Sequence, residues 1–464
     1  MPLSELKKYP KVLVVGETFH KKTGTGITLS NLFMDWPKDK LAVLSGSNIW
    51  QSDVGFCHNY YVFKKTNKIL TVYRNIFSIK VKNIEYEGVV TARDIDKYIN
   101  IQYNTVSESE KKTIIHRCIK RLSTILKIKT FIRTILKFSG LTPLINQIEI
   151  TSLMEKWIQM IKPDILYSAA NTYEQIQFIL ELHKRLNIPY AIHIGDDHIK
   201  MMPPKGLLYF YWKHKMNSQF SFLIRKAIVR LSICEYMSQI YKNRYGFDFT
   251  PYLNPIEIDK WLSFAKKKWE INKTFKILYA GRYGFDNAKL LHQLAFIIDK
   301  LNVEGFNVQL DMMFGEFTDK VKIEAFKKYN NTKIEKYIPH DNIFSVIPTY
   351  DLLYLPLGFD KKTKKIYSVS LSTKIPEYMI SGTPILVNAP EDTGYYQYAK
   401  QENWGYLLPT DNIQKLEEAI KELIENKEIR ENLGKKAKAV AIKNHDAKQV
   451  RDNFRKEFIK AIES

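Results

Sequence analysis

The sequence predicts an α/β protein built from two doubly wound parallel sheets in tandem. Short apolar runs rich in β-branched residues alternate with helical patterns, which is typical of parallel strands joined by helices. This rhythm stops within residues 252–275, which contain an Asn-Pro pair and a run of charges, and it then starts again. The 464 residues are enough for two domains with full cores.

Four apolar runs in the first half are expected to form buried strands, with a helix between the third and the fourth. They are residues 11–17, 40–46, 164–170 and 189–197. Residues 227–246 continue with a further strand and helix. We therefore assign residues 1–252 to an N-terminal domain with a parallel sheet.

The second half shows the same alternation of strands and helices. Strands are expected at residues 276–284, 306–315, 351–358 and 384–390, followed by charged helices over 411–463. We assign residues 253–444 to a C-terminal domain and expect the helices of about 445–464 to pack back on the first domain. Ligands of doubly wound sheets bind at the carboxyl ends of the strands, so the tandem predicts a ligand cleft between the two domains.

The net charge of +22 is concentrated in the N-terminal half. Residues 1–252 hold 37 Lys and Arg against 20 Asp and Glu, whereas the remainder holds 34 against 29. The chain has no uncharged apolar run of about 18 residues, and its N-terminus lacks the apolar core of a signal peptide. The three cysteines, Cys57, Cys118 and Cys234, show no metal-binding spacing. These features predict a reduced, cytoplasmic protein.

Residues 370–387, SLSTKIPEYMISGTPILV, have the pattern of a capped helix followed by a strand. Ser372 or Thr373 suits the N-cap, and the later Gly-Thr-Pro suits the helix end. Lys374 opposes the helix dipole in the first turn, and a bound anion would remove that conflict. Glu377 lies one turn further on, where a carboxylate can accept hydrogen bonds from a vicinal diol such as a ribose.

A second candidate site lies at residues 280–289, AGRYGFDNAK. Arg282 follows the end of a predicted strand, and Lys289 comes about two helical turns later. Two cations at a strand-to-helix junction suit a diphosphate, because the helix N-terminus adds its own positive end. On this stretch alone, two solvated surface cations remain an equal alternative.

These residues resemble the donor domain of retaining GT-B glycosyltransferases of the family 4 type, the glycosyl transferases group 1. The matching pieces are Gly281-Arg282, residues 351–358 and residues 372–387, in the family's order and at about its spacing. Weaker matches in the N-terminal half are GTGIT, AIHIGDD and LSICEYMSQIYKNRYG. The resemblance covers nearly the whole chain. It implies a GT-B fold, in which two Rossmann-like domains face a central cleft.

The resemblance also implies a donor site. The residues that match it are Arg282, Lys289, Ser372, Thr373, Lys374 and Glu377. In the family, the Arg, a nearby Lys and the helix-start amides hold the donor diphosphate, the Glu binds ribose hydroxyls, and the residue matching His193 lies beside the donor sugar. The sequence departs from this pattern where an acidic residue is common, eight positions before the ribose Glu, because Val369 stands there. The Arg-to-Lys289 spacing is also two residues longer than is common, so Lys374 is an alternative second cation.

On its own, a histidine on a buried strand is more often a hydrogen-bonded structural group. His193 is followed by Gly195, Asp196 and Asp197 at the carboxyl end of a strand, so we expect His193 and Asp196 to act in catalysis. Capping of the next helix by the two aspartates is the alternative. Gly26, within TGTG, would let the backbone approach the donor closely, although a flexible turn explains that stretch equally well.

Residues 111–138 have the pattern of a basic amphipathic helix or helix pair, of a kind that lies on anionic membranes. The cations expected on the membrane or acceptor surface are Arg117, Lys120, Arg121, Lys127 and Arg133. Residues 201–215 add aromatic side chains and lysines in the same domain. The alternative is a domain helix whose apolar face lies in the core.

Taken together, the sequence predicts a glycosyltransferase that moves a sugar from a UDP- or GDP-linked donor to a hydroxyl of a glycan or lipid-linked glycan. We expect retention of anomeric configuration, a role in bacterial surface polysaccharide or glycan assembly, and a peripheral position on the inner face of the cell membrane. No metal cofactor is expected, because side-chain charges can stabilise the leaving diphosphate. The alternatives are a nucleotide-sugar epimerase, a phosphorylase, a non-catalytic glycan-binding relative, or a basic nucleic-acid-binding protein. The last lacks any recognised motif, so no nucleic-acid partner is expected.

Overall fold

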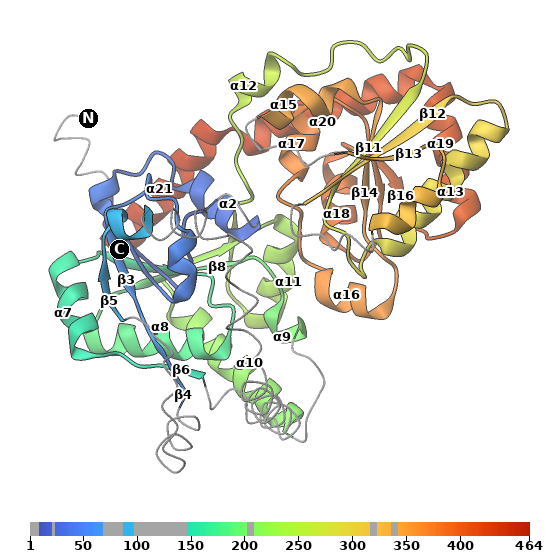
Figure 1. Cartoon of the computed structure of the whole chain (residues 1–464). Coiled ribbons are helices and arrows are strands. Elements are labelled where there is room, and N and C mark those ends of the chain that lie inside the picture. Colours follow the sequence, from blue (N-terminus) through green and yellow to red (C-terminus); the bar gives the residue numbers. More distant parts are fainter. Residues whose placement is uncertain are drawn as a thin grey trace, which may run out of the picture. The chain divides into compact units, whose positions relative to one another are not determined.

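The computed structural model describes residues 9–20, 24–67, 87–96, 146–201, 208–315, 323–335 and 342–464. The chain divides into two compact units. Figure 1 shows the whole chain, with colours that follow the sequence from the N-terminus to the C-terminus. The first unit comprises Met1–Leu231, Tyr245–Phe247 and Arg455–Ser464, and the second comprises Ser232–Arg244 and Asp248–Phe454. The domain boundaries expected after residues 252 and 444 remain predictions.

The sheet of the first unit has the strand order β9-β8-β7-β1-β2-β3-β5. Its strands are β1 (Val12–Val15), β2 (Leu41–Ser45), β3 (Asn59–Val62), β5 (Gly88–Val90), β7 (Ile165–Ser168), β8 (Tyr190–Ile194) and β9 (Val229–Ser232). β1 pairs in parallel with both β2 and β7, whereas β5 runs antiparallel to β3. β1 is fully buried, as its uninterrupted apolar run predicts for a parallel strand covered on both faces. The expected strands are confirmed.

The sheet of the second unit has the strand order β13-β12-β11-β14-β15-β16, and its neighbouring strands pair in parallel. Its strands are β11 (Phe275–Gly281), β12 (Val308–Phe314), β13 (Thr332–Glu335), β14 (Leu352–Pro356), β15 (Ile385–Asn388) and β16 (Tyr406–Leu408). Four of them were expected from the sequence, and the edge strands β13 and β16 were not. Both edge strands are short. β13 is mostly exposed and β16 is only partly buried, so neither has the fully buried apolar run that marks a central strand.

Helices surround both sheets (Figure 1). Those of the first unit are α2 (Gly24–Leu32), α7 (Ser152–Ile161), α8 (Tyr173–Leu186), α9 (His198–Met201) and α10 (Tyr209–Lys226). Those mainly of the second unit are α11 (Glu235–Tyr245), α12 (Ile258–Leu262), α13 (Ala288–Val303), α15 (Ile343–Val346), α16 (Lys361–Tyr367), α17 (Ile375–Ile380), α18 (Gly394–Glu402), α19 (Ile413–Glu425) and α20 (Lys427–His445).

Smaller elements complete the described chain. They are β4 (Lys65–Asn67) paired with β6 (Asn146–Ile148), the two-residue β10 (Thr250–Pro251), and the 3-10 turns η1 (Lys38–Lys40), η2 (Ser47–Gln51), η3 (Ala325–Lys328) and η5 (Ile347–Thr349). The last helix, α21 (Ala447–Glu463), contributes residues to both units. Its final turns belong to the first unit, where the Phe458 ring lies against Phe33, Trp36 and Tyr167.

In each sheet, later strands are added first on one side of the first strand and then on its other side. We call this point the reversal of the sheet. In the first unit the chain moves from β1 outward to β2 and β3, and later returns to β7 on the other side of β1. In the second unit β11 is followed by β12 on one side and by β14 on the other. Ligands of doubly wound folds bind at the carboxyl ends of the two strands at such a reversal. Each unit therefore has one place where a site is expected.

Candidate functional site

In the second unit, the loop after β11 holds Arg282 in a defined position. The Tyr279 hydroxyl and the Asn287 side-chain amide both donate hydrogen bonds to the Arg282 carbonyl oxygen, at 2.5 and 2.9 Å. The Arg282 guanidinium donates to an oxygen of Asp286 at 2.7 Å and lies 5.1 Å from the centre of the Tyr367 ring. Its side chain is 56% exposed, so this fixed cation is open to a ligand. Five N–H groups are available on a guanidinium, and Asp286 accepts from one nitrogen.

The α17 helix begins differently from our expectation. Lys374, and not Ser372 or Thr373, is its N-cap residue, and no side chain caps the helix. The Ser372 hydroxyl instead accepts a hydrogen bond from the Lys374 amide at 3.3 Å, which closes a turn just before the helix. The helix end is as expected, because Gly382 has a φ of +71° that favours glycine.

The side chains of α17 reach the end of β11. The Lys374 ammonium and the Tyr378 hydroxyl both donate to the Ala280 carbonyl oxygen, each at 3.1 Å. Burial lowers the pKa of Lys374, the negative charge of Glu377 raises it, and the positive charge of Arg282 lowers it further. The three charged groups therefore lie close enough to interact. This arrangement explains Lys374, because its ammonium donates to the Ala280 carbonyl oxygen and the negative charge of Glu377 favours its charged form.

Three of the seven predicted donor-binding residues thus come together at the reversal of the second sheet: Arg282, Lys374 and Glu377. Ser372 and Thr373 lie directly before Lys374 in the chain, and the Thr373 carbonyl accepts a hydrogen bond from the Asn254 side-chain amide at 3.1 Å. Lys289 is placed differently, because its ammonium pairs with Asp411 and its side chain is 67% exposed.

Two features of this site were not anticipated. Val369 is 1% exposed, so the position where relatives often carry an acid is an apolar core position in this chain. Asp286 is 5% exposed, and burial raises its pKa although its partner Arg282 opposes this. We did not single out Asp286 from the sequence. Its position four residues after Arg282 was the available signal.

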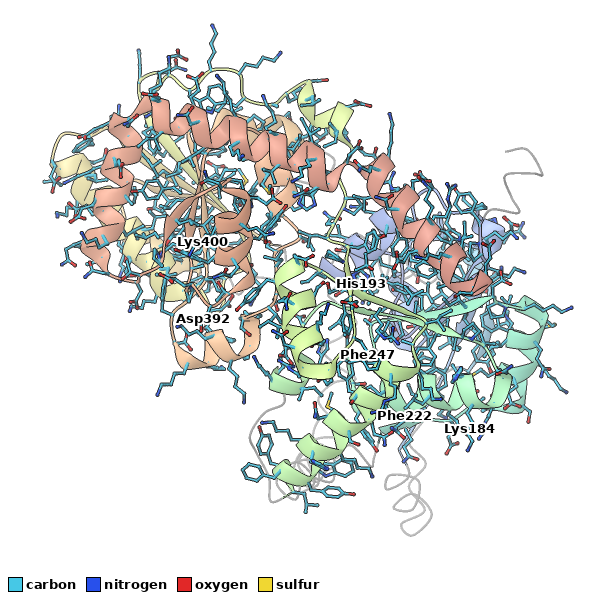
Figure 2. The ribbon with its side chains drawn as sticks, turned by 180° about the vertical axis from the view of Figure 1, so that it is seen from behind. Lys184, His193, Phe222, Phe247, Asp392 and Lys400 are labelled. Carbon is cyan, nitrogen blue, oxygen red and sulfur yellow. The ribbon has the colours of Figure 1, made fainter. Side chains whose placement is uncertain are left out.

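In the first unit, His193 lies on β8 and is 6% exposed (Figure 2). Its ring nitrogen Nδ1 and the Tyr167 hydroxyl are 2.6 Å apart, which fixes the orientation of the imidazole. Asp197 is fully buried and accepts from the Lys200 amide at 3.3 Å, so it caps the short helix α9. Asp196 precedes that cap. Burial lowers the pKa of the neighbouring His198, although the charges of Asp196 and Asp197 act in the opposite direction.

Gly26 lies in α2 and not in a turn. A side-chain carbon at this position would lie 2.3 Å from the ring of His20, so the glycine makes room for that histidine. Its proposed contact with a donor stays a prediction.

A carboxyl group that our sequence reasoning missed lies at the reversal of the first sheet. Glu17 follows β1 and accepts a hydrogen bond from the Asn171 side-chain amide, which follows β7, at 3.1 Å. Burial raises the pKa of Glu17 to about 7. The same charge, together with burial, raises the pKa of Tyr167, the partner of His193. The signal was a glutamate directly after the first buried strand.

The predicted basic surface residues Arg117, Lys120, Arg121, Lys127 and Arg133 lie outside the described residues. Among the residues that the structure does describe, no helix is both long and apolar enough to cross a membrane.

Part of the second unit matches a known protein family. Residues 263–440 match the family model described as glycosyl transferases group 1. They contain both β11 with Arg282 and α17 with Glu377, the elements that build the site described above. A comparison with curated proteins gave no match.

Solved structures resemble the whole chain. Sucrose-phosphate synthase from Thermosynechococcus elongatus is 9% identical with a TM-score of 0.59, over 97% of this chain and 98% of that one. HepE from Anabaena, solved in complex with UDP-glucose, is 12% identical with a TM-score of 0.55, over 97% of this chain and all of the other. At such identity these likenesses show the fold, which is GT-B with two Rossmann-like domains.

Proposed function

We propose that this glycosyltransferase, whose second unit carries a group 1 domain, moves a sugar from a UDP- or GDP-linked donor to a hydroxyl of a glycan or lipid-linked glycan. The observation that carries the proposal is the gathering of Arg282, Lys374 and Glu377 at the reversal of the second sheet. A strand end, a fixed guanidinium and a partly buried ammonium there offer two positive charges to a diphosphate.

Each of the three residues has its own part in this proposal. Arg282 and Lys374 bind the two phosphates and stabilise the negative charge that grows on the leaving diphosphate, so no metal is required. Glu377, which is 4% exposed, accepts hydrogen bonds from the ribose hydroxyls. The resemblance to group 1 enzymes supports retention of the anomeric configuration, with His193 beside the donor sugar.

The acceptor side of the proposal rests on the first unit. Helix α10 carries aromatic side chains that are exposed to solvent, including Phe210 at 80% and Tyr211 at 53%. It contains lysine and arginine but no acidic residue. Exposed rings together with cations suit an anionic membrane surface. We therefore propose a peripheral position on the inner face of the cell membrane and a role in surface polysaccharide or glycan assembly.

Calorimetric binding of two ligands tests the donor site. UDP or GDP is expected to bind the wild type, and inorganic pyrophosphate is expected to bind more weakly. Arg282→Ala removes a charge-assisted contact that both ligands use, so the affinity for both should fall by roughly 1.5–3 kcal/mol. Glu377→Gln should weaken the nucleotide and leave pyrophosphate unchanged, because pyrophosphate has no ribose.

Lys415→Ala is the matched control, since Lys415 is an exposed lysine of the same unit that pairs with Glu418. It should leave both affinities unchanged. Absence of binding by every nucleoside diphosphate would refute the donor site. Equal losses for nucleotide and pyrophosphate in Glu377→Gln would refute the ribose contact alone.

A further inference from the structure

Helix α16 lies in the connection that leaves β14 at the reversal of the second sheet (Figure 1). Its seven residues, KKTKKIY, include four lysines and no acidic residue. Asp360 caps its start, because the side chain accepts from the Lys362 and Thr363 amides, each at 3.0 Å. A helix this short is not stable alone, and its like charges oppose one another. Contacts with the rest of the second unit must therefore hold it in place.

Both ends of α16 are attached to the loop that contains Arg282. Before the helix, the Gly358 amide donates to the Asp286 carbonyl oxygen at 2.6 Å. A side-chain carbon on Gly358 would lie 2.8 Å from that oxygen, so the close approach requires glycine. At the end of the helix, the Tyr367 ring lies 6.1 Å from the Phe285 ring and 5.1 Å from the Arg282 guanidinium.

The Arg282 side chain needs this second contact to keep one orientation. Its ion pair with Asp286 joins residues only four apart, and the Arg282 side chain is 56% exposed. One exposed ion pair holds a long side chain weakly, because fixing that side chain costs rotamer entropy. The face of an aromatic ring attracts a guanidinium and packs against it. Burial lowers the pKa of Arg282, but contacts that include Asp286 and Tyr367 raise it above its ordinary value.

We infer that Tyr367 is a positioning residue of the donor site, which acts through Arg282. The inference rests on the proposed function, in which Arg282 binds the donor diphosphate. The Tyr367 ring and the Asp286 carboxylate hold the guanidinium at two points, so that its other N–H groups are presented to the diphosphate in one orientation. A side chain that is already ordered loses less entropy when the ligand binds. All three residues belong to the second unit.

Calorimetric binding of a nucleoside diphosphate and of pyrophosphate to the full chain tests this role. Tyr367→Ala should lower the affinity for both ligands by the same factor, roughly three- to tenfold, because both use Arg282. Tyr367→Leu keeps an apolar side chain against Phe285 and should show the same loss. Tyr367→Phe keeps the ring and should recover most of the affinity. A leucine variant that binds as tightly as the phenylalanine variant would overturn the inference.

Phe344→Ala is the matched control for the loss of an aromatic ring. The Phe344 ring lies 4.3 Å from the Lys260 ammonium, so it makes the same kind of contact in the same unit. Phe344 belongs to α15, which precedes β14 and leads to the amino end of that strand, away from the site. Both affinities should be unchanged in this variant.

A double-mutant cycle with UDP or GDP separates positioning from a structural role. In Arg282→Ala there is no guanidinium to position, so adding Tyr367→Ala should lower the affinity no further. Equal losses with and without Arg282 would show that Tyr367 acts on the ligand or on the fold directly, and they would overturn the inference. Unchanged affinity in Tyr367→Ala would also overturn it. A wild type that binds no nucleoside diphosphate would overturn the proposed function instead.

Discussion

Glu17 and Lys374 are ionisable groups that the fold buries at equivalent places, next to the first strand of each sheet. Burial disfavours the charged form of both, and it raises the pKa of Glu17 and lowers that of Lys374. Lys374 is partly compensated by the Ala280 carbonyl and by the charge of Glu377. Glu17 has only a neutral amide as partner. Groups that reduce stability in this way are characteristic of functional sites.

The burial of Glu17 predicts a pH-dependent effect on stability. Below about pH 4.5 the carboxyl is protonated in both folded and unfolded protein and has no effect of this kind. Between pH 4.5 and about 7 the unfolded chain has released the proton while the folded protein still holds it, so stability falls as the pH rises. Glu17→Gln has no such group. Its free energy of unfolding relative to wild type should therefore increase by about 3 kcal/mol from pH 4 to pH 8.

Urea unfolding at pH 4, 6 and 8 measures this difference. The exposed Glu181→Gln variant should show no comparable trend. A difference between Glu17→Gln and wild type that is the same at all three pH values would show that Glu17 is ionised with an ordinary pKa in the folded protein.

The α10 helix has one set of side chains that faces the core and another that is accessible to solvent. Its buried residues, Trp212, Met216, Phe220, Leu223 and Ile224, recur at helical spacing and face the core. Lys215 lies four residues after Tyr211, and Phe222 lies seven residues after Lys215. At these spacings the three side chains form a separate stripe along the helix. Phe222 is 46% exposed and is labelled in Figure 2. We call Tyr211, Lys215 and Phe222 the outer stripe of α10.

The outer stripe predicts binding to anionic lipid. Replacing Tyr211 and Phe222 together by serine should lower the affinity for vesicles that contain anionic lipid by about tenfold for each ring that enters the interface. Less protein should therefore be recovered with these vesicles. The measurement is vesicle flotation with and without anionic lipid. Leu153→Ser with Met160→Ser is the control, because both residues are exposed apolar residues of α7 in the same unit. Equal recovery of all variants on both kinds of vesicle would contradict the membrane proposal.

Elements with strong local sequence patterns could be predicted. Features that depend on tertiary contacts with other elements could not. The central strands were expected because each lies in a short apolar run rich in β-branched residues and bounded by turn residues. Helix α17 was found, but its first residue was misplaced, since the side chains of Ser372 and Thr373 favour an N-cap while tertiary contacts of Lys374 and Tyr378 with Ala280 fix where the helix begins. For TGTG, a flexible turn and a close approach to the donor were equal alternatives. Gly26 is in fact helical and makes room for His20.

Each unit of the molecule buries apolar side chains around its own sheet. In the second unit, for example, α13 packs between β12 and α19 with an apolar face that includes Leu290, Leu294 and Ile298. The candidate donor site lies wholly in this unit, and Glu17 with Asn171 lies wholly in the other.

This division predicts how the molecule unfolds. Calorimetry should show two transitions, and saturating UDP or GDP should raise only one of them. At about 100 times the dissociation constant, binding adds about 2.7 kcal/mol, which corresponds to roughly 5–10 °C for a domain of this size. In Arg282→Ala this shift should be much smaller while the other transition is unchanged. A single transition, or two that rise together, would contradict independent units.

Local sequence was sufficient for the α/β class and for the tandem of doubly wound sheets, and it singled out Arg282 and Glu377 as candidate donor residues, because strand periodicity and short motifs act over a few residues. Tertiary structure decided which charges meet. It placed Lys374 against Ala280, paired Lys289 with Asp411, buried Val369 in the core and enclosed Glu17 beside Asn171. Burial and charge pairing depend on residues far apart in the chain, and a pKa follows from that environment and not from the residue type.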